Sequence, residues 1–145
     1  MTQESIFLPF LALGALTFLV LTLIPLRRFR AAAAGQVKPG DFAFGESANV
    51  PGHVALPNRN YMNLLELPVL FYAACLALYV TGTVATLPLA LAWTYVGLRA
   101  AHSLVHLTTN TVMVRLTFFA LSNAVLIACG SCSRSASGRR RSDRS

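Results

Sequence analysis

Several polar residues interrupt segments that are otherwise apolar, and they form two stripes with the spacing of a helix face. The first stripe, at i, i+4 and i+7, consists of Arg59, Asn63 and Glu66. The second, at i, i+4, i+7 and i+11, consists of Tyr95, Arg99, His102 and His106. Arg115 follows near the start of the last apolar segment. Cations, an anion, imidazoles, an amide and a phenol that converge in this way indicate a site for a charged, polar ligand.

The segments that carry these residues belong to a strongly apolar chain. Its 145 residues are 55% hydrophobic and 12% charged, with a mean hydropathy of +0.59. A soluble domain normally has about 25% charged residues, so most of this surface must face lipid. A charge at bilayer depth costs about 2.5 to 3.5 kcal/mol on insertion scales, so each one needs a functional or structural reason.

Four apolar segments have the length of membrane-spanning helices, which need about 20 residues each. They lie near residues 6–26, 62–80, 87–107 and 112–128. We therefore predict an all-α integral membrane protein, a four-helix bundle formed by residues 1–130 as one domain. Residues 131–145 are rich in Ser, Gly and Arg and poor in apolar residues, which predicts a disordered basic tail.

A cluster of arginines directly follows the first predicted span and comprises Arg27, Arg28 and Arg30. Positive residues favour the cytoplasmic side, so we expect residues 31–60 to form a cytoplasmic loop. Gly and Pro punctuate this stretch and predict an irregular conformation. Both termini then lie outside. The arginines of the tail favour the opposite side for the C-terminus, and this conflict remains open.

Pro68 lies inside the second predicted span, where a proline removes a backbone hydrogen bond and kinks the helix. The carbonyl that it frees belongs to Leu64. In lipid such a carbonyl must find a partner in protein or in a wet cavity. Leu64 is close to Asn63 and Glu66 in sequence, so we expect the kink to lie at the polar site.

Plainer roles are open for several of these side chains. Glu66 and Arg99 can form an interhelical ion pair. Arg59 and Arg115 can extend along apolar surface to the lipid headgroups. In that case the polar stripes hold helices together and bind nothing.

Metal, redox and nucleic-acid chemistry are each disfavoured. His102 and His106 lie at i and i+4, but no carboxylate or thiolate accompanies them in that helix, so we expect helix-packing hydrogen bonds and no metal. Cys129 and Cys132 have redox-motif spacing but lie at the end of a span, without a strand–helix context. Five arginines and Asp143 in the tail account for +4 of the net charge of +7, and no basic face for nucleic acid is visible.

The residues from Arg59 to Tyr72, RNYMNLLELPVLFY, resemble the helix-two signature of the MAPEG superfamily, membrane-associated proteins in eicosanoid and glutathione metabolism. Residues 98–106, LRAAHSLVH, followed by Asn110 and Arg115, resemble the end of helix three in its bacterial members. The resemblance covers residues 5–130. Its specificity lies mainly in Arg59, Asn63, Glu66, Pro68 and Arg99.

This resemblance implies a homotrimer of four-helix subunits in a bacterial inner membrane, with glutathione bound as co-substrate between neighbouring subunits. The residues that it implies for binding glutathione are Arg59, Asn63, Glu66, Tyr95, Arg99, His102 and His106. An arginine lowers the thiol pKa in such enzymes, and Arg99 and Arg115 are the catalytic candidates here. The eukaryotic enzymes have tyrosines where His102 and His106 fall, and Arg115 is the nearest match to their thiol-activating arginine.

The chemistry of glutathione suits these residues, because it has two carboxylates, one ammonium and one thiol. Arginines can take the carboxylates or the thiolate, and Glu66 can take the ammonium. We therefore predict a membrane-bound glutathione-dependent transferase or peroxidase that acts on lipophilic electrophiles delivered from the bilayer. One alternative is a non-catalytic lipid-binding or scaffold member. A less favoured one is a proton-coupled carrier that uses Glu66 and the histidines.

Overall fold

The computed structural model of the chain is all-α, and it describes the backbone of residues 2–142 and the side chains of residues 2–131. A short 3-10 helix, η1 (Gln3–Ile6), leads into α1 (Phe7–Ala33), and η2 (Pro39–Phe42) lies in the loop that follows. The remaining helices are α2 (Gly52–Leu65), α3 (Pro68–Val80), α4 (Thr86–Leu107) and α5 (Val112–Ser142).

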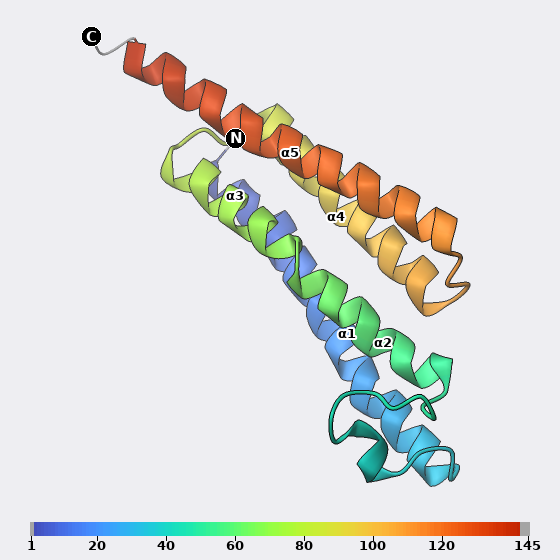
Figure 1. The fold of residues 1–145 in the computed structure, drawn as a ribbon. Helices are drawn as coiled ribbons and strands as arrows, with labels where there is room; N and C mark the ends of the chain where they lie inside the picture. Colours follow the sequence, from blue (N-terminus) through green and yellow to red (C-terminus); the bar gives the residue numbers. More distant parts are fainter. Residues whose placement is uncertain (1, 143–145) are drawn as a thin grey trace.

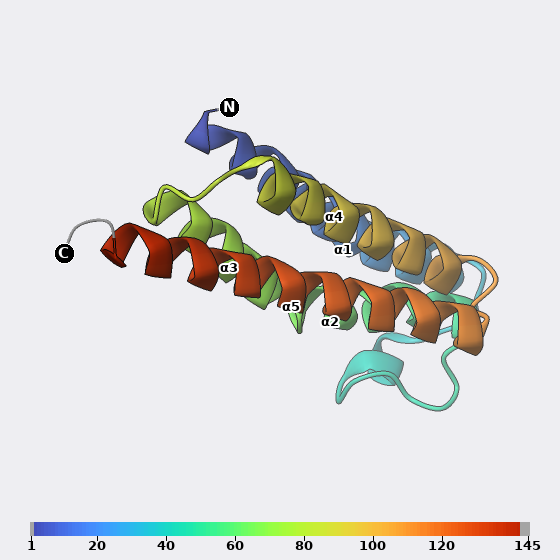
Figure 2. The ribbon, with the colours of Figure 1, turned by 90° about the horizontal axis from the view of Figure 1, so that it is seen from above.

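The helices form a bundle of four passes, because α2 and α3 follow one another as one interrupted rod (Figure 1). α1 packs against α2 and α3, and α4 packs against α5. Seen from above, α4 lies beside α1, while α5 lies beside α3 (Figure 2). The start of α1 and the end of α5 lie at the same end of the bundle, as an even number of passes requires (Figure 1).

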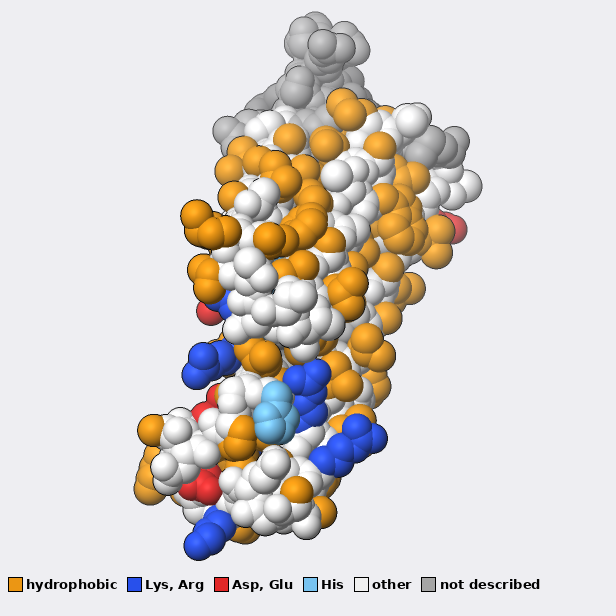
Figure 3. All heavy atoms as spheres, turned by 90° about the vertical axis from the view of Figure 1, so that its right-hand side faces the viewer, with side chains coloured by type: hydrophobic (Ala, Val, Ile, Leu, Met, Phe, Trp, Pro, Cys, Tyr) orange, Lys and Arg blue, Asp and Glu red, His pale blue; other side chains and the backbone are white. Residues whose placement is uncertain are grey.

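Much of the outer surface is apolar and suits lipid. Phe18, Val80 and Ile127, for example, are 66%, 81% and 71% exposed, and hydrophobic side chains cover much of the face in Figure 3. Three stretches of the described chain are long and apolar enough to cross a membrane: Gln3–Ala33, Gly52–Val80 and Val112–Ser131. The chain is therefore an integral, multi-pass membrane protein.

α4 forms where the third span is predicted, over 22 residues, but it is not among these three stretches. Arg99, His102 and His106 lower its hydropathy, and all three side chains are buried against other helices. The crossing of the membrane by α4 stays a prediction.

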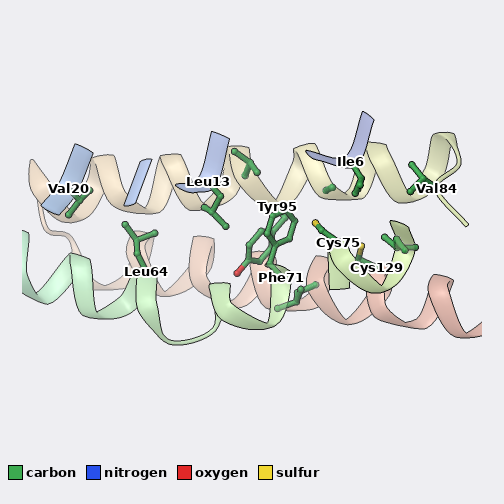
Figure 4. Packing of buried hydrophobic residues seen from close by; sticks show 13 residues of the cluster. Ile6, Leu13, Val20, Leu64, Phe71, Cys75, Val84, Tyr95 and Cys129 are labelled. Atoms are coloured by element: carbon green, nitrogen blue, oxygen red, sulfur yellow. The ribbon is translucent and has the colours of Figure 1, made fainter. Parts of the chain in front are cut away.

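The core runs along the centre of the bundle and joins all the passes (Figure 4). At its middle the ring of Phe71 on α3 stacks on that of Tyr95 on α4, with centroids 4.6 Å apart and an interplanar angle of 13°. Leu13 of α1 and Leu64 of α2 are buried in the same cluster. Close packing of this kind, rather than exclusion from water, holds helices together in lipid.

The loop between α1 and α2 is shorter than predicted. The sequence predicts an irregular loop over residues 31–60, whereas α1 continues to Ala33 and α2 begins at Gly52. Alanine is the best helix former, and three consecutive alanines form the last turn of α1. Pro57 is tolerated inside α2 because the carbonyl it leaves unpaired, that of His53, accepts a hydrogen bond of 2.7 Å from Arg27 Nη1.

Arg28 fastens this loop to α1. It forms an ion pair of 3.3 Å with Glu46, and its guanidinium lies 4.4 Å from the centre of the Phe42 ring. A small apolar cluster of Ala31, Val37 and Val54 lies beneath. The loop is therefore packed on the end of the bundle.

A turn inside the loop is organised by one carboxylate. Asp41 accepts hydrogen bonds from the backbone N–H of Lys38 at 2.8 Å and from the Ser47 hydroxyl at 3.0 Å. These two donors stabilise the carboxylate and lower the pKa of Asp41 below its ordinary value of 3.8.

α5 continues to Ser142, so the backbone of residues 131–142 is helical where the composition predicts a disordered tail. Residues 143–145 lie outside the described part of the chain, and the domain boundary at residue 130 stays a prediction.

Candidate functional site

The break between α2 and α3 leaves backbone carbonyls at the end of α2 unpaired, and an arginine donates a hydrogen bond to one of them. α2 ends at Leu65 and α3 begins at Pro68, with Glu66 at φ −79° and ψ −96°. Arg99 Nη2 donates to the carbonyl of Asn63, in the last turn of α2. A helix C-terminus has unpaired carbonyls and a negative dipole end, so a cation is stabilised there. The predicted kink is thus a complete break, and the carbonyl bound by the site is that of Asn63, one residue before Leu64.

Arg99 has more donors than partners. Its side chain is fully buried, and Nε and Nη1 have no hydrogen-bond partner among the residues that the structure describes. Its guanidinium carbon lies 5.8 Å from the centre of the Phe119 ring. A buried guanidinium with two unused donors is costly unless a ligand or another charge completes it.

His102 joins α4 to the start of α5. Its Nδ1 lies 3.0 Å from the backbone carbonyl of Arg115. A carbonyl only accepts, so Nδ1 carries the proton, and Nε2 of the neutral ring is an acceptor. Nε2 is buried and has no partner within the described residues, so it is available to a donor on a ligand.

Arg115 is fixed by two acceptors at the turn between α4 and α5. Its Nη1 lies 3.1 Å from His106 Nε2 and 2.9 Å from Asn110 Oδ1. Asn110 adopts a left-handed conformation, φ 48°, and its N–H donates to the Val105 carbonyl at 2.7 Å. Asparagine tolerates the left-handed conformation better than most residues. This conformation ends α4 and brings the Asn110 side chain into contact with Arg115.

A cavity of about 200 Å³ opens beside these groups, between α2, α4 and α5. It is lined by Asn63, His102, Val112, Arg115, Leu116 and Phe119. Polar side chains form one part of the wall, and α5 supplies apolar side chains for the rest. This combination suits a charged ligand together with an apolar molecule that reacts with it.

The structure brings part of the predicted set together. Asn63, Arg99, His102, His106 and Arg115 meet between α2, α4 and α5.

The other three predicted residues lie around this group. Tyr95 is one turn deeper, with its hydroxyl buried and unpaired among the described residues. Arg59 and Glu66 are exposed on the single subunit. The sequence left open an ion pair between Glu66 and Arg99. Among the described residues this pair is not formed, and the one ion pair joins Arg28 and Glu46.

Sequence reasoning missed two neighbours of the site. Asn60 is fully buried, and Ser103 Oγ donates to its Oδ1 at 3.3 Å, which joins α2 to α4. Phe119 lines the cavity and faces Arg99. Helical spacing could have indicated both residues. Asn60 lies four residues before buried Leu64, and Phe119 lies four residues after Arg115, so each shares a helix face with the other residue of its pair.

Within the described residues, no group of three or more His, Cys, Asp or Glu side chains is placed to hold a metal ion. The donors at the site suit an organic ligand with anionic and polar groups.

Comparisons with known proteins agree with this architecture. The MAPEG family matches residues 6–133, which include every helix pass and all the site residues described above. No curated protein and no solved structure matches the chain. The chain belongs to the MAPEG family of membrane proteins, a family of membrane glutathione-related enzymes.

Proposed function

We propose that this protein is a membrane-bound glutathione-dependent transferase or peroxidase that acts on lipophilic electrophiles. The observation that carries the proposal is the buried Arg99, whose Nε and Nη1 have no partner among the described residues. Arg99 is hydrogen-bonded to the carbonyl of Asn63, which lines the cavity together with His102 and Arg115. Such donors stabilise carboxylates or a thiolate. Glutathione supplies both, and family membership makes it the fitting ligand.

Each part of glutathione has a counterpart among the site residues. Arg59 binds a carboxylate, Arg99 and Arg115 face the other carboxylate or the thiolate, and Glu66 binds the ammonium group. Asn63, Tyr95 and the two histidines add hydrogen bonds that fix its orientation. A cation close to the thiol in a low-dielectric site favours the thiolate, which is the nucleophile.

Arg99 and Arg115 are the catalytic candidates, because Arg115 lines the cavity and Arg99 contacts Asn63 and Phe119 of its wall. In the transferase reaction, the thiolate sulfur forms a bond to the electrophilic carbon, and the leaving group departs with its bonding electron pair. Leu116 and Phe119 line the same cavity and offer an apolar surface to the electrophile. A substrate dissolved in the bilayer reaches this surface without crossing water.

The site is completed by a neighbouring subunit in this proposal. The cavity of about 200 Å³ is smaller than the roughly 300 to 1,000 Å³ of usual ligand pockets. Arg59 and Glu66 lie exposed beside it, and an exposed Glu66 at membrane depth needs a partner. We propose a homotrimer with sites between subunits, α4 as a fourth span, and the loop between α1 and α2 in the cytoplasm.

A scaffold role is the second candidate, and a specific observation favours it. Arg99 caps α2, and Arg115 is held by His106 and Asn110. These bonds join helices whether or not a ligand is present. A purely structural cluster needs no glutathione.

Glutathione binding separates the two roles. Calorimetry on the full-length protein in mild detergent should show glutathione binding, and the particle mass should equal three subunits. Glu66→Gln should weaken binding about tenfold or more, because a charged hydrogen bond to the ammonium is lost. Glu4→Gln, which removes a carboxylate at the other end of the bundle, should leave it unchanged. Absence of glutathione binding by the wild-type protein would refute the enzyme proposal.

A further inference from the structure

A second polar cavity, of about 450 Å³, lies at the loop end of the bundle. It is lined by Arg27, Arg30, Ala31, Gln36, His53 and Leu107. These residues come from α1, the loop, the start of α2 and the end of α4. The cavity shares no lining residue with the candidate glutathione site.

The charge around this cavity is positive and uncompensated. Arg27, Arg30, His53 and Gln36 supply donors, and no Asp or Glu lines the wall. Of the three arginines that end the first apolar segment, only Arg28 forms an ion pair within the described residues, and it lines a different cavity. Two guanidinium groups without a carboxylate form a site for an anion.

Arg27 is held in place before any anion arrives. Its Nη1 donates to the His53 carbonyl at 2.7 Å, and its Nη2 lies 3.5 Å from the Leu107 carbonyl. Both carbonyls are left unpaired by the helices, one because of Pro57 and one because α4 ends. Neutral carbonyls fix the guanidinium without cancelling its charge, so the cation is positioned at little further entropic cost.

The depth of the cavity matches that of lipid headgroups. Arg27 directly follows the apolar run of residues 6–26, which spans about 30 Å of hydrocarbon. Leu104 of α4 lies one turn before Leu107 and Leu19 of α1 lies about two turns before Arg27, and the two leucines are 65% and 59% exposed. Figure 3 shows Lys, Arg and His side chains toward the loop end of one face, with Asp and Glu side chains near them and hydrophobic surface beyond. An anion bound here would have apolar surface for acyl chains directly beside it.

We propose that this cavity binds the phosphate headgroup of an anionic phospholipid of the surrounding bilayer. Arg27 and Arg30 take the phosphate oxygens, His53 and Gln36 contact the polar remainder of the headgroup, and the acyl chains follow the leucines of α1 and α4. The bound lipid ties α1, α2 and α4 together at the membrane boundary. A soluble phosphate shares the phosphate chemistry but lacks the acyl chains.

Native mass spectrometry of the full-length protein, titrated with phosphatidylglycerol or with phosphatidylcholine, tests this assignment. The wild-type protein should retain one phosphatidylglycerol per subunit in preference to phosphatidylcholine. Arg30→Gln should weaken that retention about fivefold, the effect of one basic residue at a lipid surface. Arg30 is exposed, and its side chain has no hydrogen-bond partner in the described chain, so the variant should fold. Gln36→Glu, which brings a negative charge to the phosphate, should weaken retention further.

Lys38→Gln is the matched control, since it removes one positive charge from the loop directly after α1 but outside the cavity. It should retain phosphatidylglycerol as the wild type does. Glycerol 3-phosphate at millimolar concentration should not displace the lipid. Equal retention of the two lipids, equal effects of Arg30→Gln and Lys38→Gln, or displacement by glycerol 3-phosphate would each overturn the proposal.

Discussion

Arg115 and His106 are joined across the turn between α4 and α5 by a hydrogen bond of 3.1 Å from the arginine Nη1 to the imidazole Nε2. A guanidinium only donates, so the imidazole nitrogen accepts and the ring is neutral. The histidine therefore positions the cation, which lies at the mouth of the candidate glutathione cavity. The pair therefore links His106 of α4 to the arginine proposed to act on the thiol.

Replacement of His106 should reveal this positioning role. His106→Leu leaves Arg115 Nη1 with Asn110 as its remaining acceptor and should lower the free energy of unfolding by about 1 to 3 kcal/mol. His106→Gln keeps an acceptor and should lose less than half as much. Thermal or denaturant unfolding in detergent measures both. Equal losses in the two variants would contradict the role of the hydrogen bond.

Asn110 has two roles that substitution can separate, because its backbone is left-handed and its side chain accepts from Arg115. Asn110→Gly keeps the conformation, whereas Asn110→Ala should cost about 1 to 2 kcal/mol more in unfolding free energy. Both variants remove the acceptor, so both should reduce the fraction of bound glutathione that is ionised. If the glycine variant retained the wild-type thiolate fraction, the contact would have no part in placing Arg115.

Much of the bundle could be predicted because the apolar segments mark the passes directly. The predicted helix ends were less accurate where a tertiary contact outweighs the helix preference of the local sequence. Pro57 argues against a helix at that position, and only the distant Arg27, which supplies a donor to the His53 carbonyl, allows α2 to begin at Gly52. A partner 26 residues away in sequence leaves no local signal.

The candidate site likewise has features that the local sequence predicts and others that depend on contacts distant in sequence. Helical spacing groups Arg99, His102 and His106 on one face of α4, and the structure buries all three. Spacing gives no information on which carbonyl meets Arg99, since that depends on how the break at Glu66 orients the end of α2. Glu66 is exposed in the structure, and the sequence spacing alone gives no information on this exposure.

The first loop should respond to acid through Asp41. The pKa of Asp41 is lowered in the folded protein by the Lys38 N–H and the Ser47 hydroxyl. Its contribution to stability is therefore fully present above the unfolded pKa and is lost as the pH falls through the folded pKa. Asp41→Asn should accelerate hydrogen exchange of the Ser47 amide at pH 7, because that amide donates to the Asp41 carbonyl at 2.9 Å in the same turn.

The pH dependence identifies the cause of this effect. The difference between wild type and Asp41→Asn should shrink as the pH falls through the lowered pKa of Asp41, where the carboxylate becomes protonated in the folded state. Glu4→Gln serves as the control and should leave the Ser47 amide unaffected at every pH. A difference that did not decrease at all as the pH was lowered would show that charge on Asp41 is not its source.

The side of the membrane on which this loop lies can be determined by cysteine labelling. Phe44 is fully exposed in the loop, and unlike Gly45, with φ 98°, it has no backbone conformation that disfavours a side chain. Phe44→Cys, in a background with Cys132→Ser, should react with an impermeant maleimide only after the cells are opened. Reaction in intact cells would place the loop outside and reverse the proposed orientation.

Ionisation of bound glutathione tests the central claim most directly. Free glutathione is mostly protonated at neutral pH, and a thiol pKa lowered by two units corresponds to about 2.7 kcal/mol of stabilisation of the thiolate. The full-length protein saturated with glutathione should therefore show thiolate ultraviolet absorbance at pH 7. Arg99→Met or Arg115→Met should remove most of this signal while glutathione still binds. Arg30→Met, a cation lost outside the site, should retain it. Wild-type protein that binds glutathione without a thiolate signal, or retention of the full signal in both site variants, would contradict the account.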